Sequence, residues 1–157
     1  MTQPPFNVLF LCTGNSARSI MAECYLNHAG QGRFRAFSAG SIPKGQPNPL
    51  ALATLRAHGV PADGVRSKSW DEFAVAAAPQ MHLVITVCDN AAAEACPVWP
   101  AAPLKAHWSF PDPHNAADFE TVFAAIRNAV DGLVALPVET LAPSTLRRKV
   151  AELGPHQ

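Results

Sequence analysis

The chain has 157 residues, of which 48% are hydrophobic and 15% charged, and its formal net charge at pH 7 is zero. This balance gives no general attraction to nucleic acid or to a membrane surface. No segment approaches the roughly 18 apolar residues of a membrane-spanning helix, and residues 1–5 lack the basic residue and apolar run of a signal peptide. We therefore expect a cytoplasmic protein. We expect one domain over residues 1–157, with a core at about 6–135 and a C-terminal helical extension at about 137–153.

The pattern of apolar residues predicts strands that alternate with helices along the chain. Apolar runs predict strands at residues 6–11, 33–38, 81–87 and 105–108. Helical spacing predicts helices at 18–29, 49–58, 70–78, 116–136 and 144–153. Ser69 and Ser144 are the expected N-caps of the third and fifth helices. This alternation predicts an α/β fold with a four-stranded parallel sheet flanked by helices, in which ligands bind outside the carboxyl ends of the strands.

The first predicted strand runs into a polar loop that begins at Cys12 and ends at Arg18, where a helix is expected to begin. Such a loop directs successive backbone N–H groups toward one centre, and the helix dipole adds to the attraction for an anion. The Arg18 guanidinium can bind a tetrahedral oxyanion with two hydrogen bonds. The same field favours a thiolate nucleophile at the cysteine.

Within this loop we expect Gly14 to permit the turn and Asn15 to hold its shape by hydrogen bonds. Ser19, in the first helical turn, is expected to donate to the Cys12 sulfur and stabilise the thiolate. The expected anion-binding residues are Thr13, Gly14, Asn15, Ser16, Ala17, Arg18 and Ser19.

The loop and several later segments together form a family pattern. The segments are 12–19 with 21–23, then 37–40, 86–90, 96–100 and 107–113. In these motifs the chain resembles the arsenate reductases of the low-molecular-weight protein tyrosine phosphatase family, which are coupled to thioredoxin or glutaredoxin. The resemblance covers about residues 6–135. It implies a three-layer sandwich and the reduction of arsenate to arsenite in arsenic detoxification.

The resemblance also implies a relay of three cysteines. Cys12 would attack arsenate and form a covalent arseno-cysteine, Cys88 would then attack Cys12 to form a disulfide, and Cys96 would take that disulfide over. Electrons would come from thioredoxin, glutaredoxin or glutathione, with no tightly bound cofactor. Because Cys12 and Cys88 follow separate strands, we expect the loop after Cys88 to move before the two sulfurs meet.

The residue types leave other roles open for these cysteines. An external thiol such as glutathione could replace one step of the relay. Cys88, Cys96 and His107 could instead hold zinc, although no close Cys-x2-Cys pair is present, or the thiols could be inert core groups. Cys24, within the first predicted helix, is expected in the core.

In the resembling family an Asp-Pro pair such as Asp112-Pro113 supplies the general acid that protonates the leaving oxygen. Phosphatases of this fold continue with tyrosines that stack on phosphotyrosine, whereas His114 and Asn115 follow here and the only tyrosine is Tyr25. This difference favours a small inorganic substrate. The alternative is a low-molecular-weight protein tyrosine phosphatase that hydrolyses phosphomonoesters through a phosphocysteine, and some phosphatase activity is expected in either case.

Some arsenate reductases of this fold bind potassium beside the anion loop. The resemblance therefore implies a candidate potassium site at Asn15, Glu23 and Ser38, with Asp63 as a fourth candidate ligand. In the alternative, Glu23 and Ser38 hydrogen-bond the loop directly. No other metal site is expected.

Overall fold

The computed structural model describes residues 4–89, 91, 99–100 and 102–155. The strands are β1 (Phe6–Leu11), β2 (Phe34–Ala39), β3 (Leu83–Thr86) and β4 (Leu104–His107). The helices are α1 (Arg18–Ala29), α2 (Pro49–Ala57), the 3-10 helix η1 (Trp70–Phe73), α4 (Ala116–Val134) and α5 (Pro143–Leu153). The predicted alternation of strands and helices is confirmed.

The strands form a parallel sheet in the order β2-β1-β3-β4, which confirms the predicted fold class. Leu11 pairs with Ala39 of β2 on one side and with Thr86 of β3 on the other, and Thr86 pairs with His107 of β4. The carboxyl ends of the four strands therefore lie level at one edge of the sheet. The chain leaves β1 toward β2 and later returns to β3 on the other side, so this edge carries the crevice expected at a switch in strand order.

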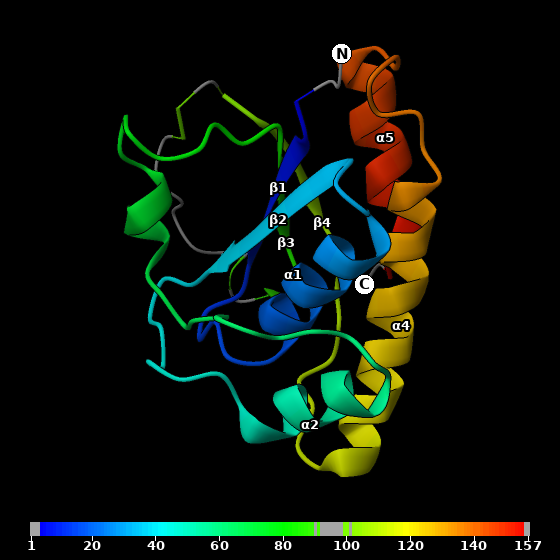
Figure 1. The fold of residues 1–157 in the computed structure, drawn as a ribbon. Coiled ribbons are helices and arrows are strands. Elements are labelled where there is room, and N and C mark those ends of the chain that lie inside the picture. Colours follow the sequence, from blue (N-terminus) through cyan, green and yellow to red (C-terminus); the bar gives the residue numbers. More distant parts are fainter. Residues whose placement is uncertain (1–3, 90, 92–98, 101, 156–157) are drawn as a thin grey trace.

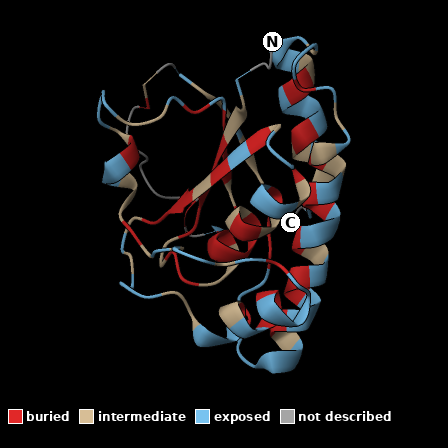
Figure 2. Cartoon of the chain, in the orientation of Figure 1, coloured by how far each residue is buried: buried red, intermediate tan, exposed pale blue. Residues whose placement is uncertain are grey.

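The sheet is covered on both faces. Helices α1, α4 and α5 lie on one side of it and η1 on the other (Figure 1). Alternate residues of β1 divide between these layers: Val8 and Phe10 belong to the core under the helices, whereas Leu9 and Leu11 pack in a smaller cluster with Phe73 of η1. The buried residues accordingly run along the strands and the inward sides of the helices (Figure 2).

Two helix predictions were wrong in their bounds. The helix expected at 70–78 is only the 3-10 turn η1, in which Ser69 accepts a hydrogen bond from the Asp71 N–H and Phe73 is buried. The last helix begins at Pro143 rather than after Ser144, because proline occupies its first turn and Ala142 is the capping residue. None of the helices described here is long and apolar enough to cross a membrane.

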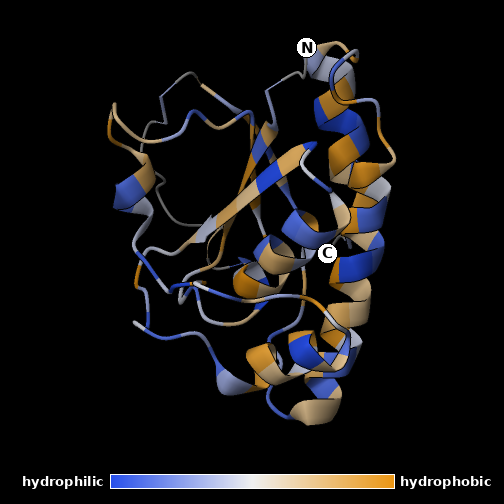
Figure 3. Cartoon of the chain, viewed as in Figure 1, coloured by the Kyte–Doolittle hydropathy of each residue, from blue (hydrophilic) through white to orange (hydrophobic). Residues whose placement is uncertain are grey.

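The long helix α4 and the last helix α5 alternate hydrophobic and hydrophilic residues along their length (Figure 3), as expected of helices with one buried side. Helix α5 packs against β4 and α4. The indole of Trp108, which is fully buried directly after β4, donates to the carbonyl oxygen of Val150 at 2.8 Å. This hydrogen bond ties the last helix to the loop that follows β4, which carries Asp112.

The buried centre of β3 offers a test of the core. Ile85 is fully buried and Ile42 is 69% exposed. Because the Ile85→Ala substitution leaves a cavity between the layers, we expect it to lower the free energy of unfolding by about 2–5 kcal/mol. Ile42→Ala is the matched control and should change it by less than about 0.5 kcal/mol. Urea denaturation measures both, and equal values would contradict this placement of β3.

Candidate active site

The loop between β1 and α1 has the shape of an anion cradle. Its left-handed position is Asn15, with a φ of 43°, and not Gly14, so the expectation that Gly14 permits the turn was wrong. Asparagine tolerates this conformation better than most residues. Asn15 is fully buried, and its side chain holds the loop as predicted.

The Asn15 amide is hydrogen-bonded on both of its polar atoms. Its nitrogen donates to Ser19 Oγ and to Ser38 Oγ, both at 2.9 Å, and its oxygen accepts from the backbone N–H of Lys68 at 2.8 Å. The loop is thereby joined to α1, to β2 and to the segment before η1. Because Asn15 uses the Ser19 oxygen as an acceptor, the Ser19 hydroxyl proton is left to be donated elsewhere, and donation to Cys12 stays a prediction.

Gly40, at the end of β2, contacts the loop from the side. A Cβ atom built on Gly40 would lie 2.4 Å from the carbonyl oxygen of Thr13 and 2.5 Å from that of Cys12. Glycine is required here by this close approach of two backbones. Sequence reasoning included residue 40 in a motif but gave no reason for it, because the approach depends on the register between β1 and β2.

The beginning of α1 is open to an anion. Its N-cap, Ala17, makes no side-chain capping hydrogen bond, and the first turn has no acidic residue. The Nε of Arg18 is buried and has no hydrogen-bond partner among the described residues. A buried donor without a partner is costly, so the arrangement favours an oxyanion that accepts from Arg18 and from the helix N-terminus.

Arg18 also joins the loop to the segment after β4. Its Nη1 donates to the carbonyl oxygen of Phe110 at 2.8 Å, and its Nη2 lies 3.6 Å from Asp112 Oδ1. The Asp112 side chain is 62% exposed, so this carboxylate lies at the mouth of the cradle. The two residues that the motifs assigned to anion binding and acid catalysis are therefore brought together.

Cys12 and Cys88 are adjacent, at the ends of the paired strands β1 and β3. Both are buried free thiols, and they are hydrogen-bonded to each other. The expectation that the loop after Cys88 must move before the sulfurs meet was wrong for this pair, because β1 and β3 are direct neighbours in the sheet.

The two thiols titrate as one unit. The hydrogen bond from Cys12 lowers the pKa of Cys88 to about 5, and hydrogen bonds from the Ala91 and Thr13 backbone act in the same direction. The hydrogen bond from Cys88 and then burial raise the pKa of Cys12, whereas Arg18 and the Gly14 backbone lower it. The two sulfurs can therefore share one proton: their hydrogen bond favours the thiolate at Cys88, whereas the charge of Arg18 favours it at Cys12.

Hydrogen bonds to β4 and to the residues after it fix the segment that carries Cys88. Asp89 Oδ1 lies 2.9 Å from His107 Nε2 and accepts from Ser109 Oγ at 3.0 Å. These two hydrogen bonds, that of His107 first, lower the pKa of Asp89. His107 Nδ1 lies 2.7 Å from Thr86 Oγ1. Through these contacts His107 holds the loop after β3 in place. The role of Asp89 was missed, although its place beside Cys88 was the available signal.

The three residues suggested for potassium do lie together. The Ser38 hydroxyl, which accepts from Asn15, donates to Glu23 Oε1. Lys68 Nζ lies 3.7 Å from the same carboxylate oxygen. Sequence reasoning missed Lys68, because it lies far from Glu23 in the sequence. Asp63 is exposed in the connection after α2 and lines a surface hollow with Leu52 and Arg56.

Of the other two cysteines, the structure describes Cys24 but not Cys96. Cys24 is buried, and burial raises its pKa to about 12, which fits the core role that was expected. Cys96 lies outside the described residues, so its role in a relay or in a zinc site stays a prediction. Within the described residues, no cluster of three or more His, Cys, Asp or Glu side chains could hold a metal ion.

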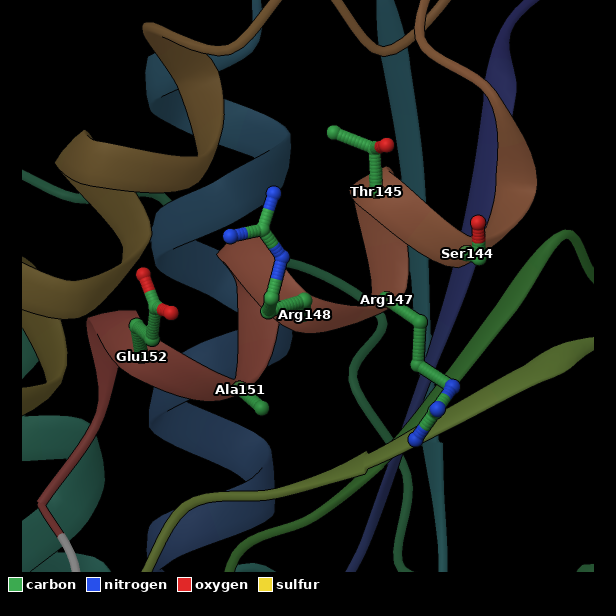
Figure 4. A pocket seen from close by; sticks show the side chains of 6 residues that line it. All are labelled: Ser144, Thr145, Arg147, Arg148, Ala151 and Glu152. Atoms are coloured by element: carbon green, nitrogen blue, oxygen red, sulfur yellow. The ribbon is translucent and has the colours of Figure 1, made fainter.

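A hollow of about 460 Å³ lies on the surface of α5. The side chains of Arg147 and Arg148 leave the helix in different directions there (Figure 4), so they do not converge on one ligand. None of the residues that line it belongs to the predicted site. The hollow is a surface feature, whereas the buried donors and thiols gather at the carboxyl edge of the sheet.

Comparison with known proteins agrees with this geometry. The family model of the low molecular weight phosphotyrosine protein phosphatases matches residues 7–151. The chain belongs to this family. Within the family, an arsenate reductase of Shouchella clausii is 31% identical over 137 residues, which cover 85% of this chain and 95% of the relative.

Two solved structures place the chain in the same part of the family. An arsenate reductase in its phosphate-binding state is 27% identical, with a TM-score of 0.70 over 83% of this chain and 97% of that chain. The thioredoxin-dependent arsenate reductase of Corynebacterium glutamicum is 25% identical, with a TM-score of 0.61 over 81% of this chain and 61% of that chain. The recognised resemblance to arsenate reductases of this family is thereby confirmed.

The close approach at Gly40 can be tested by adding one methyl group. In Gly40→Ala the new Cβ would overlap the Thr13 and Cys12 carbonyl oxygens, so the loop must shift. We expect phosphate binding, measured by calorimetric titration, to weaken about tenfold, since such overpacking costs roughly 1–3 kcal/mol. Gly132→Ala is the control, because there the added Cβ meets only the end of the Leu153 side chain. Unchanged phosphate affinity in Gly40→Ala would contradict the role given to this residue.

The shared charge of the two thiols predicts an unusual reactivity profile. Because the lower pKa of the pair is about 5, the rate of alkylation by iodoacetamide should already level off below pH 7, whereas an ordinary cysteine titrates at about 8.5. Cys12→Ala and Cys88→Ala each remove the hydrogen bond between the thiols and should move the midpoint upward. The rates are followed by intact mass in a phosphine reductant, with Cys24→Ser as the control. A wild-type midpoint near that of free cysteine would refute the coupled pair.

Proposed function

We propose that this protein reduces arsenate to arsenite, with Cys12 as nucleophile and Cys88 as the resolving thiol. The observation that carries the proposal is the hydrogen-bonded pair of free thiols inside an anion cradle. A phosphatase of this family needs one such thiol, whereas transfer of two electrons to arsenic needs two. The relatives named arsenate reductase support the same assignment.

In the first step arsenate lies in the loop 13–19, where Arg18 and the backbone N–H groups of α1 neutralise its charge. The Cys12 thiolate attacks arsenic, forming an S–As bond while one As–O bond breaks. Asp112, 3.6 Å from Arg18, protonates the departing oxygen, which leaves as water. The oxidation state of arsenic is still +5, and the role of the loop is to hold the anion in line with the sulfur.

In the second step Cys88, as thiolate, attacks the Cys12 sulfur. The S–S bond forms, the S–As bond breaks, and its electron pair stays on arsenic, which is thereby reduced and leaves as arsenite. The two sulfurs are together oxidised by two electrons, so the step balances without another reactant. Their contact before the reaction shortens the path that this attack requires.

The disulfide must then be reduced by other thiols. We propose that Cys96 takes it over from Cys12 and Cys88, and that thioredoxin or glutaredoxin reduces it, with glutathione as an alternative donor. The likeness to a thioredoxin-dependent relative supports a thiol donor. We place this reaction in the cytoplasm, where such thiols are kept reduced. We also propose that residues 1–157 are one domain, because Leu146 and Val150 of α5 are buried in the same core as β1 and α4.

Hydrolysis of phosphomonoesters is the second candidate function, because the Cys12, Arg18 and Asp112 set is also that of a phosphatase. The residues after Asp112 favour the first candidate. His114 and Asn115 stand there, and both are used in capping α4: the His114 N–H donates to Asp118, and Asn115 accepts from the Asp118 N–H. Neither position carries a tyrosine, the residue with which phosphatases of this fold stack on a phosphotyrosine ring.

Steady-state reduction separates the two functions. With arsenate and a thioredoxin or glutaredoxin system, we expect NADPH consumption by the wild type and a loss of at least about a thousandfold in Cys12→Ser. Cys88→Ser should also stop arsenate turnover but keep slow hydrolysis of p-nitrophenyl phosphate, since water can release phosphate from Cys12 without a second thiol. Cys96→Ser tests the third step.

The control variant is Cys24→Ser, which should turn over arsenate like the wild type. Mixing the reduced protein with arsenate alone should lower its mass by about two daltons, the two hydrogens lost in one disulfide. Full arsenate turnover in Cys88→Ser would show that the relay is wrong. Fast phosphate-ester cleavage with no arsenate turnover in the wild type would establish the phosphatase instead.

A further inference from the structure

Lys68 carries an ammonium group that is buried behind the anion loop. The residue is 7% exposed, its Nζ donates to the carbonyl oxygen of Arg66 at 2.8 Å, and the same atom lies 3.7 Å from Glu23 Oε1. Burial lowers the pKa of Lys68 and raises that of Glu23, and each charge opposes the shift of the other. A buried charge without its partner is strongly unfavourable, so each group is held as an ion by the other.

The backbone directs this lysine inward. Gly40 and Ser69 form a parallel bridge, in which the Gly40 N–H donates to the Lys68 carbonyl oxygen at 3.0 Å and the Trp70 N–H donates to the Gly40 carbonyl oxygen at 2.9 Å. The segment 68–70 thus continues the sheet at the end of β2. Successive side chains of such a segment alternate in direction. The Lys68 side chain is therefore placed against α1 by the sheet itself.

Lys68 and Glu23 close a ring of hydrogen bonds around Asn15. The Lys68 N–H donates to the Asn15 amide oxygen, the Asn15 nitrogen donates to Ser38 Oγ, and the Ser38 hydroxyl donates to the Glu23 carboxylate. The carboxylate then faces the Lys68 ammonium. Every donor in this ring points toward Glu23, and this direction holds only while Glu23 is ionised, since a protonated carboxyl can donate to Ser38 instead.

A potassium ion does not fit this arrangement. Its three expected ligands are Asn15, Glu23 and Ser38, and hydrogen bonds from the Lys68 N–H and the Asn15 amide already occupy one of the two lone pairs on the Asn15 and Ser38 oxygens. The Glu23 carboxylate is neutralised by an ammonium 3.7 Å away. A second cation against Glu23 would be repelled by that ammonium in a buried environment, where charges interact more strongly than in water.

We propose that Lys68 is a built-in counter-ion that takes the place of a bound monovalent cation behind the anion loop. It keeps Glu23 ionised, and thereby fixes the direction of the Ser38 and Asn15 hydrogen bonds. Lys68 is a positioning residue, because it acts on the loop through Glu23 and Asn15. The inference rests on the proposed function only in assigning the loop to arsenate.

The counter-ion also bears on the Cys12 thiolate. Asn15 donates to Ser19 Oγ as well as to Ser38 Oγ, so the orientation of its amide leaves the Ser19 hydroxyl proton available for Cys12. Without the ammonium, Glu23 either takes up a proton and loses its role as an acceptor or stays ionised as a negative charge behind the loop. Both changes disfavour a thiolate at Cys12.

Thermal unfolding of Lys68→Ala and of the wild type, compared in potassium chloride and in choline chloride at equal ionic strength, tests the proposal without arsenate. Choline is too large for the space that the lysine leaves. The wild type should unfold at the same temperature in both salts. In Lys68→Ala potassium should fill the vacated position beside Glu23 and raise the unfolding midpoint by roughly 2–4 °C, with saturation.

The rate at which iodoacetamide alkylates the Cys12–Cys88 pair is the second readout. In choline chloride at pH 6 the rate should fall about twofold in Lys68→Ala, as follows from a rise of the lower pKa of the pair by one unit from about 5, and potassium should restore it. Lys149→Ala, which removes an exposed lysine from α5, is the control and should behave like the wild type in both salts. If Lys68→Ala slowed alkylation only through a loss of packing, potassium would not restore the rate.

The double variant Lys68→Met/Glu23→Gln covers the case in which Lys68→Ala fails to fold. Because it removes both charges, no unpaired ion is left in the buried position. The double variant should therefore fold, and its unfolding midpoint should not change with potassium. A wild type that potassium stabilises saturably would overturn the proposal, because a cation site would then exist beside Lys68. Lys68→Ala with no response to potassium in either readout would overturn it equally, and so would failure of both variants to fold in potassium chloride.

Discussion

The site depends on one buried amide. Asn15 stands in a left-handed conformation, and its hydrogen bonds to Ser19, Ser38 and the Lys68 backbone join three separate elements to the loop. A buried polar network in which every member is paired holds one geometry. The N–H groups of the loop are therefore oriented before an anion arrives, and preorganised donors of this kind are the main source of electrostatic stabilisation in enzymes. Gly40 completes the arrangement by letting β2 approach the loop.

The local part of the site was predictable from the sequence, and the long-range part was not. Cys12 and Arg18 lie in one short loop, so their relation follows from the strand, the loop and the helix that contain them. Lys68 reaches Glu23 only because residue 69 bridges to residue 40, and Asp89 acts through His107 of another strand. The position of Asp89 beside Cys88 marks it as a residue of interest, but the partners of Lys68 and Asp89 cannot be found from the sequence, because both contacts arise from strand order and register. The same reason explains why the contact between Cys12 and Cys88 was mistaken for one that requires movement.

The fold was predictable to a similar degree. Continuous apolar runs gave the strands closely, because both faces of a parallel sheet are buried. The two helix errors came from local chemistry that overrides periodicity. At η1 a serine cap and the burial of Phe73 produce one tight turn without a continuing helix. At α5 the proline at 143 begins the helix before the serine that was taken as its cap. Cys96, the third cysteine of the expected relay, lies outside the described residues, so its role stays a prediction.

The proposed reductase differs from a phosphatase on this scaffold by a second thiol beside Cys12. In this chain it is Cys88, held by the Ala91 N–H on one side and, through Asp89, by His107 and Ser109 on the other. A disulfide brings two sulfurs to about 2.05 Å, which is closer than a hydrogen bond allows. Bond formation therefore pulls Cys88 toward β1 and away from the Ala91 N–H. Oxidation of the pair would thus break the hydrogen bond that Cys88 accepts from the Ala91 N–H.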